Sequence, residues 1–395
     1  MLRLVDAHVH LAYPDFAHDA ASVVERAKAH GVAAALCVSV NHHDAPRVLE
    51  LAAAHPEFAA PCLGIHPVQH EESGVPRPVR PEETAAMMVL LEKHADVLVA
   101  VGEIGLDYSP WILRGEDYRL KKLEPTAEIV TVESSTAASA DPNERERIAK
   151  ANQIAAFREQ VLFAKAHGLP VNVHSRNAGK YVVEMLAELQ ADKVLLHAFD
   201  GSAAVAKRAV ALGYCFSVPP NVVRSPHFQQ VVATIPIENL LLETDAPALA
   251  PLPKPAAAAG ADASAGDCCG APASSSQADN VKAEEAVASQ SGSSPATATT
   301  TATSSSSSSL ASSSKGKGSS SGKASSKASK ASAAPPLAFD DLVPPVPDPA
   351  RNEPANVYLS AQAVARIKNI PVEEVVRITT ANAIRIFPKL ARLLA

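Results

Sequence analysis

The sequence has no excess of basic residues: 36 Lys and Arg stand against 42 Asp and Glu, which gives a formal net charge of −6 at pH 7. A protein that binds nucleic acid tightly usually carries a basic patch or stripe. The composition therefore disfavours a sequence-specific DNA-binding protein. An enzyme that holds a nucleic-acid end through metal ions and a few local cations stays compatible with this charge.

Cysteine is scarce as well, with five in 395 residues. Cys37, Cys62 and Cys215 lie in apolar runs, where a free thiol behaves as a small hydrophobic side chain. Cys268 and Cys269 are adjacent and match no spacing of zinc ligands. This usage indicates a reducing compartment rather than a disulfide scaffold.

Long apolar runs are absent. No segment approaches the roughly 20 apolar residues that a membrane span requires, and the first residues lack the charged and apolar regions of a signal peptide. We therefore expect an intracellular protein, in the cytoplasm or the nucleus, with no membrane partner.

Apolar side chains are nearly missing from residues 251–349, which consist mainly of Ala, Ser, Gly, Thr and Pro with scattered Lys. Such a composition cannot offset the entropy of ordering, so we predict a disordered insert. The remaining residues, 1–250 and 350–395, amount to roughly 300, enough for a single α/β barrel domain. A smaller expansion at 113–141 carries mixed charge and is predicted to form a surface loop.

Short apolar, β-branched runs alternate with segments of helical period, and this order predicts repeated strand–helix units. Eight such units favour right-handed crossovers and a closed (β/α)8 TIM-type barrel, with the insert after strand eight. The predicted strands are Leu4–His10, Ala33–Val40, Phe58–Ile65, Val97–Glu103, Pro170–Ser175, Lys193–Ala198, Gly213–Val218 and Asn239–Asp245. The predicted helices include Asp19–His30, Glu144–His167, Ala178–Leu189, Ala203–Leu212 and Val372–Phe387.

The first predicted strand carries two histidines in an alternating pattern. Because strand side chains alternate between faces, Asp6, His8 and His10 should share one face. Two imidazoles on a buried strand are costly unless a partner satisfies them, and a metal ion does so. Two hydrogen-bonded core histidines are the alternative interpretation.

Four further strands end in residues of ligand type: Glu103, His174, His197 and Asp245. The carboxyl ends of barrel strands meet on one face, where barrel enzymes place their chemistry. With His8 and His10 they make six ligand-type residues, whereas a catalytic zinc commonly uses three and a water. The surplus predicts two metal ions, with the Glu103 carboxylate bridging them.

The chain also resembles the TatD family of metal-dependent hydrolases in a series of ordered motifs, and departs from that pattern only in the two expansions. The motifs are Asp6–His10, Gly64–Pro67, Gly102–Asp107, Leu169–Arg176, Glu243–Pro247, Arg351–Pro354 and Thr380–Ala383. Cys62–Gln69 and His197–Gly201 are most similar to a vertebrate branch of the family.

The resemblance implies a barrel of the metal-dependent hydrolase superfamily and a 3′→5′ exodeoxyribonuclease or related phosphodiesterase. It implies that the six residues are metal ligands, shared out as His8, His10, Glu103 and Asp245 on one ion and Glu103, His174 and His197 on the other. Asp245 is the candidate to take a proton from the attacking water. Zinc suits the four histidines, while Mg²⁺ or Mn²⁺ would be usual for a phosphodiester substrate.

Three more residues are candidates for supporting roles. His66 matches an active-site position of the family and could contact a phosphate or the leaving group, although it could equally be a loop histidine without a part in catalysis. Arg176 could bind a substrate phosphate, or pair with Asp107 or another carboxylate at the barrel mouth. Asp6 is expected to hydrogen-bond a liganding histidine.

Three functions fit these observations. The first is a monomeric hydrolase that acts on single-stranded DNA or 3′ ends, with RNA as an alternative substrate. The second keeps the metal ions but cleaves an ester or amide, as an aminoacyl-tRNA deacylase would. The third is a non-catalytic barrel scaffold, which the presence of all six ligand-type residues disfavours.

Overall fold

The computed structural model describes residues 3–115, 141–251, 339, 341–348 and 351–395. The disorder predicted for 251–349 and the surface loop predicted at 113–141 therefore fall almost entirely outside the described residues. At the end of the insert, Phe339 is buried, and the backbone of Val346 exchanges two hydrogen bonds with the Asn356 side chain. The packed part of the chain thus resumes before residue 350, earlier than the predicted domain boundary.

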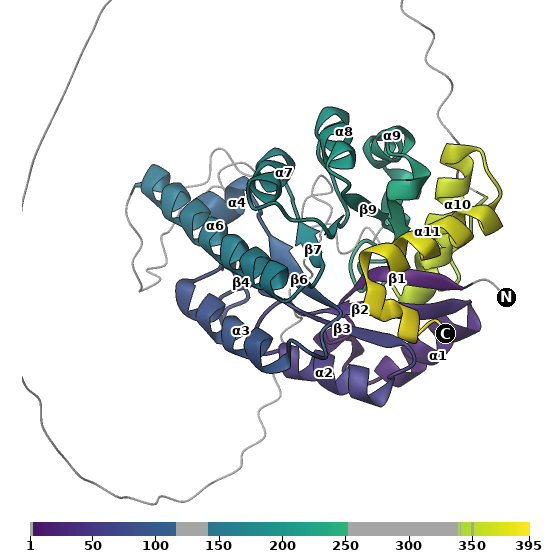
Figure 1. Ribbon diagram of the computed structural model, residues 1–395, viewed down its shortest axis with the longest axis horizontal. Coiled ribbons are helices and arrows are strands. Elements are labelled where there is room, and N and C mark those ends of the chain that lie inside the picture. Colours follow the sequence, from purple (N-terminus) through teal and green to yellow (C-terminus); the bar gives the residue numbers. More distant parts are fainter. Residues whose placement is uncertain (1–2, 116–140, 252–338, 340, 349–350) are drawn as a thin grey trace, which may run out of the picture. The chain divides into compact units, whose positions relative to one another are not determined.

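Eight parallel strands form one sheet in chain order (Figure 1). They are almost wholly buried because helices cover their outer faces, and this explains why they read as apolar runs. The strands are β1 (Leu4–Val9), β2 (Val32–Val38), β3 (Ala59–Leu63), β6 (Ala100–Gly105), β7 (Val171–His174), β8 (Val194–Leu196), β9 (Cys215–Val218) and β10 (Leu240–Leu242).

Two backbone hydrogen bonds just beyond β10 join the last strand to the first. The Asp245 N–H donates to the His8 carbonyl at 2.9 Å, and the His10 N–H donates to the Ala246 carbonyl at 2.8 Å. The sheet is thereby closed at its carboxyl end, and the predicted eight-stranded barrel is confirmed.

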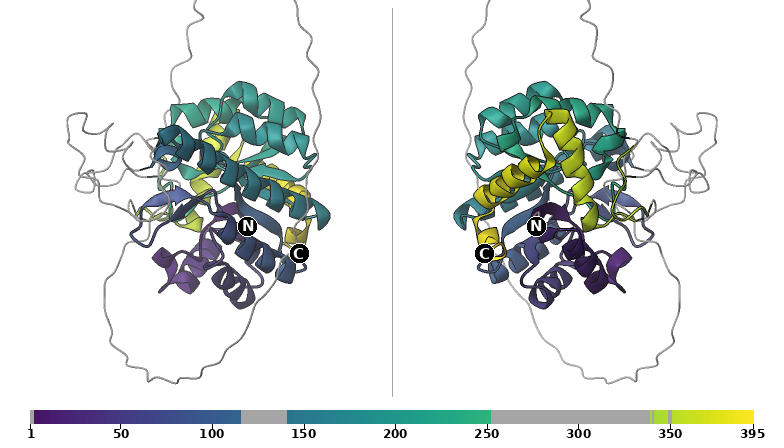
Figure 2. Two further views of the ribbon diagram at one scale, coloured as in Figure 1. Left: turned by 90° about the vertical axis from the view of Figure 1, so that its left-hand side faces the viewer. Right: turned by 90° about the vertical axis from the view of Figure 1, so that its right-hand side faces the viewer.

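Helices surround the barrel (Figures 1 and 2), and each of the five predicted helices is present. In the described part of the chain, no helix has the length and apolar character needed to cross a membrane. The α-helices are α1 (Ala20–Ala29), α2 (Ala45–Ala54), α3 (Pro81–His94), α4 (Pro110–Arg114), α6 (Pro142–Ala166), α7 (Gly179–Glu188), α8 (Ala203–Ala211), α9 (Pro226–Thr234), α10 (Val357–Lys368) and α11 (Val372–Ile386). Short 3₁₀ turns are η1 (Pro14–Phe16), η2 (Pro220–Arg224), η3 (Ile237–Asn239), η5 (Pro354–Asn356) and η6 (Pro388–Arg392).

The longest helix, α6, shows how local sequence sets these elements. The Asp141 carboxylate caps its first turn by accepting the Asn143 N–H at 2.9 Å, and a proline occupies the first helical position. Phe157 and Val161 bury one face of the helix in the core. The chain then turns at Gly168, whose φ of +65° favours glycine.

Sequence analysis missed one small element, the antiparallel hairpin of β4 (Val68–His70) and β5 (Pro76–Pro78). Strands of three residues, one of them flanked by prolines at both ends, carry too little alternating pattern to be recognised. The three described cysteines are free and buried, as expected.

The segment after the insert is bound tightly to the barrel. The Asn352 amide donates to the Thr244 carbonyl at 2.8 Å and to the Ala248 carbonyl at 2.9 Å. Glu353 accepts two bonds from the Arg26 guanidinium of α1, both at 2.8 Å. Residues 351–356, which we call the closing segment, therefore connect the end of β10 to α1.

Replacing Asn352 by alanine should lower the free energy of unfolding by about 2–4 kcal/mol, because two buried carbonyls lose their donors. Urea denaturation followed by circular dichroism measures this change. Glu82→Ala, an exposed position on α3, is the control and should stay within about 0.5 kcal/mol of the wild type. A similarly small effect at Asn352 would show that the closing segment contributes little.

Candidate metal centre

The structure brings all six residues of ligand type together at the carboxyl end of the barrel. Parallel strands all deliver their last residues to the same rim. Each of the six side chains is at most 3% exposed. They come from β1, β6, β7 and the segments just beyond β1, β8 and β10: His8, His10, Glu103, His174, His197 and Asp245.

Four of these side chains direct their ligand-type atoms toward one common position. His8 Nε2 lies 3.1 Å from His10 Nε2, and Glu103 Oε2 lies 3.4 and 3.3 Å from the same two nitrogens. Asp245 Oδ1 lies 3.5 and 3.3 Å from them. In a tetrahedral site with metal–ligand bonds of about 2.0–2.1 Å, neighbouring ligand atoms lie about 3.3–3.4 Å apart. We call this set the first cluster.

The second cluster forms around the other oxygen of the same glutamate. Glu103 Oε1 lies 2.8 Å from His197 Nε2, 3.0 Å from His174 Nδ1 and 3.5 Å from His66 Nε2. The nitrogens of His174 and His197 are 3.4 Å apart. Glu103 thus presents one oxygen to each cluster, the arrangement expected of a bridging ligand.

Unpartnered atoms at the site fit a cation. Among the described residues, neither carboxylate oxygen of Asp245 has a hydrogen-bond partner, although both are buried. A buried carboxylate in that state is costly unless a cation or a water satisfies it. Nitrogen and carboxylate donors at these spacings suit a divalent metal ion, so the residues present fit one ion in each cluster.

The charges of the site favour the same conclusion. Burial alone would raise the pKa of Glu103, but the surrounding histidines, His197 first, hold it well below its usual range. Burial lowers the pKa of His10, yet the carboxylates of Asp245 and Glu103 outweigh it and raise the pKa to about 9. Glu103 is therefore ionised, and it attracts positive charge that metal ions can supply in place of protons.

His66 behaves differently from the other histidines. It follows β3 on a loop, as predicted, and burial lowers its pKa to about 4, so its imidazole is neutral. Its Nδ1 lies 2.9 Å from the Val68 carbonyl, while its Nε2 faces Glu103. The ring therefore belongs to the second cluster, which the sequence alone did not indicate.

Two polar residues that were not among the predicted site residues contact the histidine rings of the clusters. Asn172 Oδ1 lies 2.9 Å from His8 Nδ1, and Asp107 Oδ2 lies 3.1 Å from His174 Nε2. Such partners fix the tautomer and orientation of a liganding histidine. In the sequence, each is a polar residue inside an apolar motif: Asn172 stands two residues before His174, and Asp107 stands four residues after Glu103.

Glu243 is a third residue that sequence analysis missed. It is fully buried, accepts the Ala198 N–H at 2.9 Å and the Ser217 hydroxyl, and lies 3.8 Å from His197 Nδ1. It thus connects the ends of β8, β9 and β10 directly behind His197.

Asp6 contacts His8 through the backbone, and its other partners lie just beyond β10. Its carboxylate accepts the backbone N–H of His8 at 3.3 Å, the Thr244 N–H at 2.9 Å and the Thr244 hydroxyl at 2.5 Å. The pairing register of β1 shifts between Asp6 and Val9, so strict alternation does not apply there. Asp6 joins the first strand to the segment beyond the last, while Asn172 is the residue in contact with the His8 ring.

Arg176 lies on the loop beyond β7, partly exposed. Its guanidinium carbon is 5.9 Å from the centre of the Trp111 ring. The suggested partner Asp107 directs its two oxygens to His174 and to the Ser109 N–H. A substrate-binding role for Arg176 stays a prediction.

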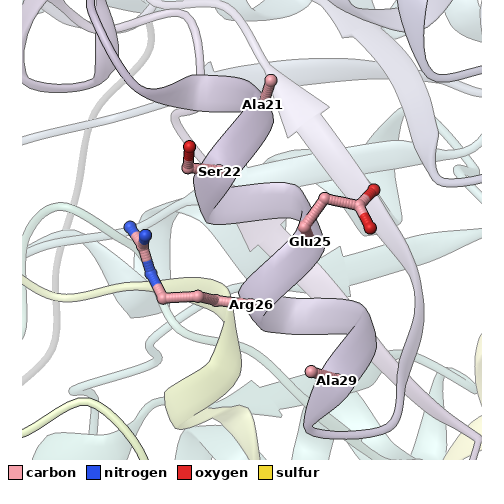
Figure 3. Close-up of a pocket in the computed structure, with 5 residues that line it drawn as sticks. All are labelled: Ala21, Ser22, Glu25, Arg26 and Ala29. Atoms are coloured by element: carbon pink, nitrogen blue, oxygen red, sulfur yellow. The ribbon is translucent and has the colours of Figure 1, made fainter.

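A separate hollow lies on the outer face of α1 (Figure 3) and is lined by Ala21, Ser22, Glu25, Arg26 and Ala29. All five residues come from one helix, and none belongs to either cluster. Arg26 is already paired with Glu353 of the closing segment. This hollow is therefore unrelated to the candidate chemistry.

Comparison with known proteins gives consistent matches. The family model described as TatD-related DNase matches residues 5–265. The chain is 30% identical over 391 residues to human deoxyribonuclease TATDN3, a match that covers 99% of this chain and 97% of the human protein. It is also 30% identical over 252 residues to YabD of Bacillus subtilis, named as an uncharacterized metal-dependent hydrolase, covering 63% and 82% of the two chains. The crystal structure of the TatD homologue YjjV from Escherichia coli superposes with a TM-score of 0.58 at 20% identity, over 98% of each chain.

Proposed function

Because the chain belongs to the TatD family of metal-dependent hydrolases, we propose that it binds two divalent cations and hydrolyses phosphodiester bonds of DNA from the 3′ end. The observation that carries the proposal is the Glu103 carboxylate, which offers one oxygen to each cluster. The family model and the human relative, both named for deoxyribonuclease activity, support DNA as the substrate.

We assign His8, His10, Glu103 and Asp245 to one cation, and Glu103, His174 and His197 to the other. His66 offers a further nitrogen to the second cation or contacts the substrate beside it. The predominance of imidazole nitrogens favours zinc over Mg²⁺ or Mn²⁺. We further propose that the protein acts as a monomer inside the cell.

When bound, a pair of divalent cations lowers the pKa of a water molecule, orients it and stabilises the leaving oxygen of an in-line displacement. The chain supplies the remaining parts. Asp245 keeps an oxygen without a hydrogen-bond partner among the described residues, so it can accept a proton from the attacking water. Asp107, Asn172 and Glu243 hold the histidines in place, and the buried barrel mouth strengthens every electrostatic contact.

The deciding test is the digestion of a single-stranded oligonucleotide labelled at either the 3′ or the 5′ end. Release of single nucleotides from the 3′ end supports the proposal. If no oligonucleotide is cleaved while amino acids are released from aminoacyl-tRNA, the proposal fails in favour of an ester hydrolase.

Metal removal gives a second prediction. The protein as isolated should hold close to two divalent ions per chain, and dialysis against a chelator should abolish hydrolysis and lower Tm, since ions that bind only the folded state stabilise it. Elemental analysis and thermal unfolding measure both effects, with re-addition of zinc or manganese as the control. Full activity in the metal-free protein would contradict the assignment.

A further inference from the structure

We propose that Trp111 and Arg176 form a stacking platform for a nucleobase of the strand being cleaved. This inference rests on the proposed function, since it assumes that the chain acts on a nucleic acid. It assigns a ligand to Trp111, which none of the roles above uses.

The pair stands beside the second cluster. Trp111 lies in α4, four residues beyond Asp107, whose carboxylate holds His174. Arg176 lies two residues beyond His174 on the neighbouring loop. The two loops are fixed to each other, because the Tyr108 N–H donates to the Arg176 carbonyl at 3.0 Å and the Asn177 amide donates to the Ser109 hydroxyl at 3.1 Å.

The chemistry of the pair suits a base. The guanidinium carbon of Arg176 lies 5.9 Å from the centre of the Trp111 ring, and both side chains are partly exposed. Ile112 and Leu113 are the residues of α4 that are buried in the core, whereas the Trp111 indole is only partly buried. Aromatic rings and guanidinium planes both stack on nucleobases with little regard to sequence.

The charge of the chain also favours stacking as the source of affinity. With a net charge of −6, the chain has no overall excess of cations with which to make many phosphate contacts. Asp200 interacts electrostatically with Arg176 and His174, and its carboxylate reduces the positive potential around them. A stacking contact contributes binding free energy that does not depend on net charge.

The kinetic test compares the wild type, Trp111→Ala and Trp111→Phe on single-stranded decathymidylate and on the same strand with two abasic 3′-terminal nucleotides. Trp111→Ala should raise KM for the normal strand about tenfold, ~1.4 kcal/mol, and reduce the preference over the abasic strand by the same factor. Trp111→Phe should restore most of that preference. Val89→Ala, 68% exposed on α3, is the surface control.

The outcomes separate the two proposals. If the wild type cleaves both strands and Trp111→Ala keeps the wild-type preference, the platform is wrong while the nuclease assignment stands. If the wild type cleaves neither strand, the nuclease assignment is wrong. The stacking platform is then tested by the binding measurements alone.

Binding can be read directly, because Trp111 is the only tryptophan in the chain. Phosphorothioate decathymidylate, which resists cleavage, should quench its fluorescence, whereas the abasic strand should not. The anisotropy of a labelled strand reports binding independently. Either binding without a change in emission or no binding at all would overturn the platform.

Discussion

The Glu103→Ala variant should lose both metal ions and at least about 1,000-fold in hydrolysis, because several kcal/mol of metal-ion catalysis disappear together. One carboxylate serves the two clusters, so a single substitution opens both. Its Oε2 lies 3.4 Å from His8 Nε2, and its Oε1 lies 2.8 Å from His197 Nε2. No other residue of the site faces both clusters in this way in the described part of the chain.

Elemental analysis after gel filtration, together with the oligonucleotide assay, measures these losses. Glu82→Ala removes an exposed carboxylate from α3 and should keep both ions and full activity. If Glu103→Ala retains two ions per chain, the bridging assignment is wrong. If the variant retains one ion, the two clusters bind their ions independently, and Glu103 is a ligand of only one of them.

Asp245→Asn should behave differently, with kcat reduced about 10²- to 10⁴-fold while most of the metal remains. The amide oxygen of asparagine can replace Oδ1 beside His8 and His10. The amide nitrogen that replaces Oδ2 cannot accept a proton. Because Oδ1 is the oxygen beside the two histidines, Oδ2 is the one that we expect to take the proton from the attacking water. Single-turnover rates and metal content, measured on the same preparation, distinguish the two effects.

The matched comparison is with Asp245→Ala, which should lose metal as well as turnover. An asparagine variant that cleaves at the wild-type rate would exclude Asp245 as the proton acceptor. If the asparagine variant loses the ion of the first cluster, the negative charge of Asp245 is needed to bind that ion.

The fold could be predicted from the sequence because the barrel strands are almost wholly buried. Such strands appear as apolar runs between helices, and all eight are present near their predicted positions. Closure of the barrel was favoured by the eight strand–helix units, but the contacts that make it could not be predicted. It depends on hydrogen bonds of Asp245 and His10 just outside the regular strands, where register follows from tertiary packing rather than from local pattern.

The metal clusters were predictable for a related reason, since ligands at strand ends reach a common rim in any parallel barrel. The residues that orient them were not. His8 and Asn172 are 164 positions apart in the sequence and meet only when β1 and β7 face each other across the barrel mouth. The bonds from Thr244 to Asp6 likewise join residues 238 positions apart, so no local pattern could indicate them.

The segments that follow the insert are held to the start of the barrel and to the end of β10 by direct hydrogen bonds. The Thr380 hydroxyl of α11 donates to the Arg3 carbonyl at 2.7 Å, so the last long helix packs against the first strand. The closing segment meanwhile holds the chain after the insert to β10 without help from the covalent connection. These two contacts do not depend on the order in which the chain connects the segments. A circular permutant that begins at residue 339 and joins the present termini through a linker should therefore retain both of them.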